Sequence, residues 1–513
     1  MHPFIASLIS FVSRSETLGA LFNRLIVHRA ASVARNRPHP WSTVHPYTSW
    51  TSLTDKTYSA RHLPEADDVA HPDIDRLLDL FRQKDGQQRL SPYSTCLFPA
   101  FAQYLTDGFI RSGVLHPNPL DRTTAQNLRN TSTHNIDLCT LYGRNDLQAR
   151  ALRALDDTPG QRGRLLSQDI NGEEYSPYYD ADTFGDLDPP LFDPNTVPPD
   201  HQAQLFAVGG DRVNTAPQVV MINTLLLREH NRVAALICDS EPDWDDERVF
   251  QTTRNVMIVL FIKIVIEEYI THIGATPFQF RADPSVAWNK KWNREVWITT
   301  EFSLLYRWHA LVPATIRWGS QTLPVHETFH NNALLTARGL AGAFADMSAQ
   351  ASGRLGPFNT PEALLHIEGN SIDQGRLAKL DTYAAYRRYV GLSAPSTFAD
   401  ISADREVQDL LAGLYDSPRD VEFFVGLFAE DLSPNSPLPE LIRTMVALDA
   451  FTQALTNPLL SEHVYKRATF GDVGWALLKK PASLGTLLAR NCPNPDPEAH
   501  ISMTQKGAEP AGA

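Results

Sequence analysis

The chain has 513 residues and a formal net charge of −13 at pH 7, with 42% hydrophobic and 20% charged residues. A chain of this length and composition can bury a large core, which excludes a disordered or fibrous protein. The negative charge excludes nucleic acid as a partner, because the phosphate backbone would repel it.

The N-terminal stretch, residues 4–34, has apolar residues clustered at helical spacing around the polar break Ser13-Arg14-Ser15-Glu16. Its apolar runs are too short for a membrane span, and it lacks the basic start and cleavage site of a secretory signal. Two interpretations stay open: a helical hairpin packed on the body of the protein, or an amphipathic region lying in one leaflet. Prolines at 38 and 40 close this region, which we place at 1–37. We expect a cytoplasmic protein or one peripheral to the membrane.

Helical patterns dominate the rest of the chain, and strand signals are limited to a hairpin near 313–326. The strongest helix prediction, 245–273, opens with acidic residues, closes at Gly274 and is apolar on nearly all sides, so we expect a buried central helix. The other predicted helices are 72–84, 96–112, 147–157, 217–238, 300–311, 329–352, 371–389, 403–415, 418–428 and 439–455. The sequence thus predicts a mainly α-helical catalytic domain over 38–490 and a flexible tail over 491–513.

Residues 300–313, TEFSLLYRWHALVP, carry the pattern that is most informative about function. Read as a helix, this stretch puts Tyr306 and His309 one turn apart on one face. A neutral imidazole is a common ligand of haem iron, and a phenol one turn away lies within short electron-transfer reach of that iron. Taken alone, an aromatic-rich apolar stretch is more often part of a core.

The string EFSLLYRWHALVP resembles the proximal haem segment of the prostaglandin H synthases (cyclooxygenases), a branch of the animal haem peroxidase superfamily. The resemblance extends from about 46 to 490 and implies a multi-helical haem peroxidase fold with very little β structure, and haem b as cofactor. It also implies that His309 ligates the iron and that Tyr306 carries the radical that attacks a fatty acid. Other segments that match in order are FAQYLTDGFI (101–110), LYGRND (141–146), LLLREHNRV (225–233), QTTR (251–254), FIKIVIEEY (261–269), SGRLG (352–356), LSPNS (432–436) and FGDVGWALLK (470–479).

The distal segment departs from the family pattern. Gln103 is present, but Asp107 stands four residues later where the family has a histidine, and His134 is not at that position. Arg212, sixteen residues before Arg228, stands where myeloperoxidase-like enzymes have a distal arginine and cyclooxygenases have none. We expect Gln103, Asp107 and Arg212 to act on bound peroxide, with Arg212 holding Asp107 ionised. The alternative is a distal pocket that has lost peroxidase function.

The resemblance also implies a substrate channel that ends at Tyr306. Phe302, Leu305 and Trp308 flank the tyrosine as in cyclooxygenases, and core packing explains these three residues equally well. The approximate matches at the channel mouth are Arg29, for the arginine that anchors the fatty-acid carboxylate, and Thr452, for the serine that aspirin acetylates. The tyrosine that partners this arginine is not found, so we expect a substrate unlike arachidonate.

Secreted members of the family carry a disulfide that this chain lacks. Val69 stands at the first cysteine position, while Cys492 takes the other, which favours a reducing compartment. We also expect no growth-factor-like module of the kind that the animal enzymes carry.

The sequence therefore predicts a haem-dependent dioxygenase that uses O2 and peroxide to oxidise an unsaturated fatty acid through a tyrosyl radical. A plain haem peroxidase acting on small reductants and a haem-binding relic without turnover are the alternatives. The resemblance allows a homodimer.

Overall fold

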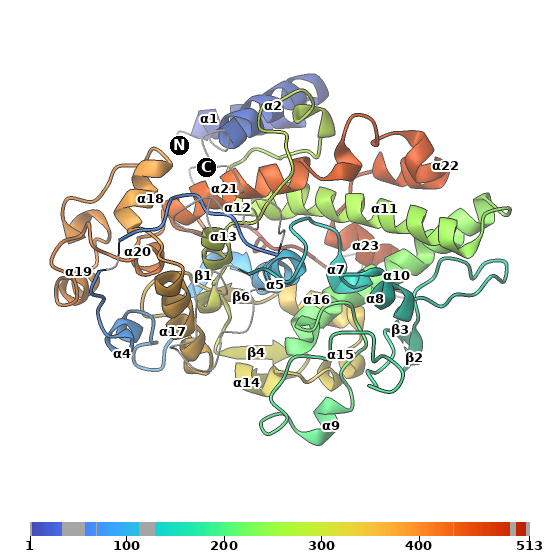
Figure 1. The fold of residues 1–513 in the computed structure, drawn as a ribbon, viewed down its shortest axis with the longest axis horizontal. Coiled ribbons are helices and arrows are strands. Elements are labelled where there is room, and N and C mark those ends of the chain that lie inside the picture. The colour runs from blue at the N-terminus through green and yellow to red at the C-terminus, as the bar shows by residue number, and fades with distance from the viewer. Residues whose placement is uncertain are drawn as a thin grey trace.

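A computed structural model describes residues 3–32, 57–67, 69–111, 129–433, 436–492 and 499–508 of the chain. Helices dominate these residues, and the strands form three two-stranded sheets (Figure 1). The structure thus confirms the mainly α-helical fold with little β structure.

Two long helices, α10 (Pro217–Ser240) and α11 (Asp246–Ile264), pack against each other in the centre of the molecule (Figure 1). The Asp245 side chain caps α11 by accepting a hydrogen bond from the backbone of Arg248. The predicted helix 245–273 is confirmed, but its last part widens into a π-helix over Val265–Ile270 before α12 (Thr271–Gly274). A π-turn inside a helix often marks a functional position.

Helix α5 (Leu97–Phe109) packs on α10, and α22 (Arg467–Leu478) packs on α11. Helix α22 was not predicted, because Gly471 and Gly474 break its pattern. Gly474 is required by the packing, since a Cβ atom there would lie 2.4 Å from Val256 on α11. Sequence periodicity alone does not reveal such a close approach.

The remaining helices surround this centre. They are α4 (Ile74–Leu77), α7 (Cys139–Tyr142), α8 (Asp146–Ala151), α9 (Pro199–Gln202), α13 (Thr300–Leu305), α14 (Val325–Thr328), α15 (Ala333–Arg338), α16 (Leu340–Ser348), α17 (Glu362–Leu377), α18 (Tyr383–Tyr389), α19 (Arg405–Ala412), α20 (Phe423–Ala429), α21 (Glu440–Leu455) and α23 (Leu484–Asn491). The sheets pair β1 (Leu90–Thr95) with β6 (Ala351–Gly353), β2 (Gln168–Ile170) with β3 (Glu173–Tyr175), and β4 (Thr315–Trp318) with β5 (Gln321–Pro324). The last pair confirms the predicted hairpin. The four cysteines are free and buried.

The stretch 300–311 is not one continuous helix, contrary to the prediction. Helix α13 ends at Leu305, and a separate 3₁₀ turn covers His309–Leu311. Between them the Tyr306 and Trp308 rings stack with centroids 4.6 Å apart. Residues two apart point to different sides of an α-helix, so this stacking and the helical path exclude each other.

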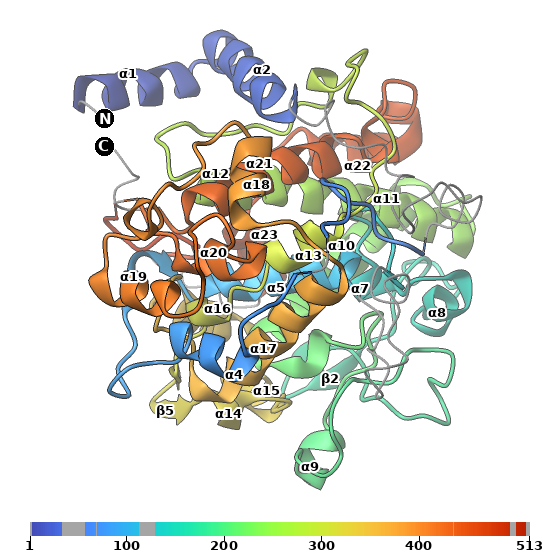
Figure 2. The ribbon, with the colours of Figure 1, turned by 60° about the vertical axis from the view of Figure 1, so that its left-hand side comes forward.

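The N-terminal helices α1 (Pro3–Arg14) and α2 (Glu16–Ser32) lie on one side of the molecule, with α2 against α21 (Figure 2). The Asn23 amide exchanges two hydrogen bonds with the backbone of Arg281, and Arg24 pairs with Asp283 at 3.1 Å. Polar contacts therefore hold this hairpin on the body.

Part of the predicted flexible tail is packed. The backbone N–H of Thr95 donates to the carbonyl oxygen of Met503, and that of Gln505 donates to Tyr93. The Met503 side chain is buried. Residues 499–508 are therefore joined to β1, which corrects the expectation for this part of 491–513.

Candidate active site

His309 begins the 3₁₀ turn that follows α13, and its ring lies against a carboxylate from α17. The His309 Nδ1 atom is 3.2 Å from Oε2 of Glu368, whose side chain is 1% exposed. No hydrogen bond to the His309 Nε2 atom is found in the described part of the chain. An imidazole held through Nδ1 presents Nε2 as a ligand for a metal.

Tyr306, three residues before this histidine, lies in an aromatic cluster. Its ring centroid is 4.6 Å from those of Phe302 and Trp308. Phe302 and Leu305 are fully buried, and Trp308 is nearly so. The structure therefore brings together the three flanking residues that the sequence singled out, in positions that serve core packing and a channel wall alike.

The Tyr306 phenol stays protonated at neutral pH. Burial raises its pKa above the ordinary value of 10, and the charge of Asp449 adds to this, while the Tyr269 hydroxyl group lowers it. Tyr269 comes from the π-helix, and its buried hydroxyl group makes no hydrogen bond within the described residues. Oxidation of Tyr306 must therefore release a proton together with the electron.

Gln103 and Asp107 lie four residues apart on α5, as predicted, and so share a face of this helix. The Gln103 side-chain amide donates to the Thr215 hydroxyl oxygen at 2.7 Å. The Asp107 side chain is 9% exposed, and its Oδ2 atom has no hydrogen-bond partner among the described residues. A buried carboxylate oxygen of this kind is available to a ligand.

The charge of Arg212 does not keep Asp107 at the pKa of a free carboxyl group, although a pKa of about 6 leaves most of this group ionised at pH 7. Burial raises its pKa to about 6, although the charge of Arg212 lowers it. The Arg212 guanidinium donates to the carbonyl oxygen of Ile110 at 3.3 Å, and the described residues show no ion pair between Arg212 and Asp107. Desolvation thus outweighs the arginine, because the carboxylate lies inside the protein while the two groups do not touch.

The neighbour of Arg212 is anchored by an ion-pair network. Asp211 pairs with Arg111 and Arg144, each at 3.0 Å. Burial raises the pKa of Asp211, but the hydrogen bonds and charges of these arginines outweigh burial and lower it. The backbone that carries Arg212 is therefore fixed.

Arg307 connects the two sides of the site electrostatically. Burial lowers the pKa of this guanidinium to about 10, as does the charge of Arg212, while Glu368 and Asp107 raise it. Its Nε atom has no partner among the described residues. Proximal and distal groups thus act on one cation, and the unpartnered polar atoms of Asp107 and Arg307, together with the Nε2 atom of His309, fit a cofactor with anionic groups and a metal.

The two residues matched to the channel mouth are not in this cluster. Arg29 is exposed on α2, on the outer face of the molecule. Thr452 is buried on α21, and its hydroxyl group donates to the carbonyl oxygens of Leu448 and Asp449 within its own helix. Helix α21, which carries Thr452, contacts α13, but this contact assigns Thr452 no role.

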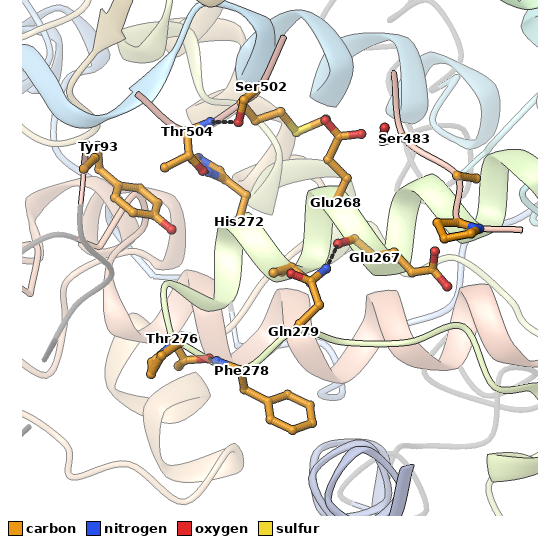
Figure 3. Close-up of a pocket in the computed structure, with 16 residues that line it drawn as sticks. Tyr93, Glu267, Glu268, His272, Thr276, Phe278, Gln279, Ser483, Ser502 and Thr504 are labelled. Carbon is orange, nitrogen blue, oxygen red and sulfur yellow. Dashed lines mark hydrogen bonds between the residues drawn. The ribbon is translucent and has the colours of Figure 1, made fainter. Parts of the chain in front are cut away.

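A separate cavity of about 510 Å³ lies beside the π-helix (Figure 3). Burial raises the pKa of Glu268 in its wall to about 7, and the carboxylate accepts the backbone N–H of Leu484. His272 is held between the hydroxyl groups of Ser94 and Thr504. These contacts join the π-helix to α23 and to the C-terminal segment, so the groups have structural roles and lie outside the site of Tyr306.

Three site residues were not assigned a role from the sequence: Arg307, Tyr269 and Glu368. Tyr269 lies within the matched segment FIKIVIEEY, which is the signal that could have found it. No pattern in the sequence around Glu368 identifies it as a site residue, because its role follows from a contact between two distant segments.

The comparisons with known proteins agree with this geometry. The family model for animal haem peroxidases matches residues 101–501. Prostaglandin G/H synthase 1 of Mus musculus is 30% identical over 499 residues, which are 93% of this chain and 79% of that protein. Prostaglandin G/H synthase 2 of Cavia porcellus is 29% identical over 493 residues, 91% of this chain and 77% of that protein. The chain belongs to the animal haem peroxidase family, whose members are oxidoreductases that bind haem.

Solved structures with the same fold include a fatty acid alpha-dioxygenase. The variant of the Oryza sativa enzyme with palmitic acid has a TM-score of 0.73 at 15% identity, covering 99% of this chain and 98% of that one. Peroxidase A of Dictyostelium discoideum has a TM-score of 0.70 at 20% identity, covering 88% and 96%. The fold is thus shared by oxygenases and peroxidases.

Proposed function

We propose that this protein is a haem b-dependent dioxygenase that adds O2 to an unsaturated fatty acid through a radical on Tyr306. The observation that carries the proposal is the position of the Tyr306 phenol, which is partly buried among aromatic rings three residues before His309. A phenol buried in this way can carry a radical next to a metal centre and keep it from water.

His309 would hold the iron through Nε2, and Gln103, Asp107 and Arg212 would act on the peroxide that the haem binds. The bound haem supplies the one-electron oxidant that peroxide generates. Everything after this is chemistry of Tyr306 and the lipid. Tyr306 loses an electron and a proton, and its phenoxyl oxygen removes a hydrogen atom from the acid. O2 adds to the carbon radical, and the peroxyl radical takes a hydrogen atom back from Tyr306, which gives a hydroperoxide and restores the radical.

An unsaturated acid is the proposed substrate, because a hydrogen atom between two double bonds is the easiest for a phenoxyl radical to remove. The names of the relatives, prostaglandin synthases and a fatty acid alpha-dioxygenase, support a lipid substrate. The side chains of Phe302, Leu305 and Trp308 make the surroundings of Tyr306 apolar, which suits an acyl chain.

The test is incubation of the haem-loaded protein with arachidonate, linoleate, oleate and palmitate, a small amount of peroxide and O2. We expect uptake of O2 with at least one unsaturated acid and a hydroperoxide or endoperoxide identified by mass spectrometry. Absence of uptake with all four acids, together with rapid oxidation of guaiacol, would show a plain peroxidase. That second candidate is favoured by Arg212, a residue of peroxidase type, and by the fold shared with Peroxidase A.

The distal residues give a prediction of their own. Asp107→Ala and Arg212→Ala each slow the reaction of the haem-loaded protein with peroxide by roughly 10²–10⁴-fold, the usual range for general acid–base groups. In the parent protein the rate falls as the pH drops below about 6, since a base with a pKa of about 6 becomes protonated there. Stopped-flow spectra at the Soret band between pH 4 and 8 measure both effects.

The variant Glu406→Ala, which changes an exposed carboxylate on α19, is the control for these two. An Asp107→Ala protein that reacts with peroxide as fast as the parent would show that Asp107 is not the base. That result would favour the haem-binding relic.

The N-terminal helices support a proposed contact with a membrane surface. Their outward face carries exposed apolar side chains at helical spacing, while the opposite face of α2 is buried. The exposed residues are Ile5, Leu8, Phe11, Leu18, Leu21, Phe22 and Leu25. No described helix has the length and apolar character needed to cross a bilayer. A peripheral contact is thus the arrangement that fits this face.

The double variant Phe11→Ser/Leu25→Ser tests the contact. The two side chains are 69% and 58% exposed, and each contributes about 1.5–3 kcal/mol when buried in an apolar phase. We expect binding to phosphatidylcholine–phosphatidylserine vesicles to fall at least about tenfold in sedimentation. Leu147→Ser, which changes a side chain 64% exposed on α8, should bind as the parent does. Equal binding of all three proteins would exclude the contact.

A further inference from the structure

The carboxylate of Glu368 is placed to act on His309. Glu368 lies on α17, a helix separate from the segment that carries Tyr306 and His309. Its side chain is 1% exposed, and its Oε1 atom accepts a hydrogen bond from the Thr360 hydroxyl group at 2.9 Å. Its other oxygen, Oε2, lies 3.2 Å from the Nδ1 atom of His309.

These two atoms lack hydrogen-bond partners elsewhere in the described part of the chain. Neither Oε2 of Glu368 nor Nδ1 of His309 makes a hydrogen bond of full geometry in the described residues, although both are buried. Two unsatisfied polar atoms at this distance complete a hydrogen bond when the imidazole ring turns slightly. Because the hydrogen bond from Thr360 fixes the Glu368 carboxylate, we expect the His309 ring to make this turn.

We propose that Glu368 is a positioning residue that accepts the Nδ1–H of His309 and so fixes the tautomer whose Nε2 atom carries no proton. The proposal rests on the proposed role of His309 as the iron ligand. In this tautomer the lone pair of Nε2 is directed away from Glu368 and is available to the iron.

A carboxylate has a second effect that a neutral acceptor lacks. It raises the electron density of the imidazole it binds, which makes the imidazole a stronger ligand. A more electron-rich ligand stabilises the ferric state over the ferrous state and lowers the reduction potential. The same change favours cleavage of a bound peroxide, as electron donation from an axial ligand does in other haem proteins.

The variant Glu368→Gln tests this, because it keeps the size of the side chain and replaces the charged acceptor with an amide. In the haem-loaded protein we expect a higher reduction potential, a lower frequency of the iron–histidine stretch in the ferrous resonance Raman spectrum, and haem affinity reduced about 10–100-fold. The matched control is Glu362→Gln, which removes an exposed carboxylate from the first turn of the same helix. It should leave all three quantities at their parent values.

A second measurement tests the role of Glu368 if the Glu368→Gln protein folds poorly. In His309→Gly, added imidazole can take the place of the lost ring and donate its second N–H to Glu368, whereas 1-methylimidazole cannot donate. We expect the double variant His309→Gly/Glu368→Gln to bind imidazole about tenfold more weakly than His309→Gly does, and to bind 1-methylimidazole equally well.

The outcomes separate this inference from the proposed function. Parent values of the potential and of the stretch in Glu368→Gln, or equal imidazole binding in the two glycine variants, would overturn the role of Glu368 while leaving His309 as ligand. Absence of an iron–histidine stretch in the parent protein itself would overturn the ligand assignment, and the role of Glu368 with it.

Discussion

Replacing Tyr306 with phenylalanine is expected to abolish oxygenation of a fatty acid while the protein keeps its fold and its haem. The substitution removes one hydroxyl group and retains the ring that packs on Phe302 and Trp308. Without the hydroxyl group no phenoxyl radical forms, so no hydrogen atom is taken from the lipid. Any oxidation of guaiacol by peroxide should continue, because it does not need this phenol.

Measurement of O2 uptake with the preferred acid, beside guaiacol oxidation and the Soret band, tests this expectation. Tyr175→Phe is the control, since it removes a buried hydroxyl group that contacts Glu173 outside the site. Retained oxygenation in Tyr306→Phe would rule out the tyrosyl radical. Loss of both activities would point to a structural role of the hydroxyl group.

His309→Ala is the second substitution with a large expected effect, loss of haem. The proximal segment has no other imidazole to offer the iron, and Arg307 beside it is a cation that does not ligate metals. We expect the purified variant to lack the Soret band and to lose added haem on gel filtration. Both enzymatic activities should then be absent.

The control for this variant is His366→Ala, which changes an exposed histidine on α17 close to Glu368 in the sequence. It should retain haem as the parent does. A His309→Ala protein with an unchanged Soret band would remove the assignment of His309 as ligand. Added imidazole should restore part of the Soret band if the vacated space lies at the iron.

The sequence by itself determined the features that depend on near neighbours in the chain. The periodicity of 245–273 predicted the central helix, and the spacing of Gln103 and Asp107 placed both on one face of α5. The resemblance of 300–313 brought Tyr306 and His309 together. Local spacing carries this information, because residues within a turn or two are close whatever the rest of the chain does.

Only the tertiary structure decided the burial, the pKa values and the long-range contacts of these groups. Burial raises the pKa of Asp107 to about 6 against the opposite effect of Arg212, and this desolvation depends on atoms from many elements. The stacking of Tyr306 on Trp308 ends α13 early, because packing there opposes the helical path. Glu368 reaches His309 only through the position of α17, a contact between distant segments that no local pattern encodes.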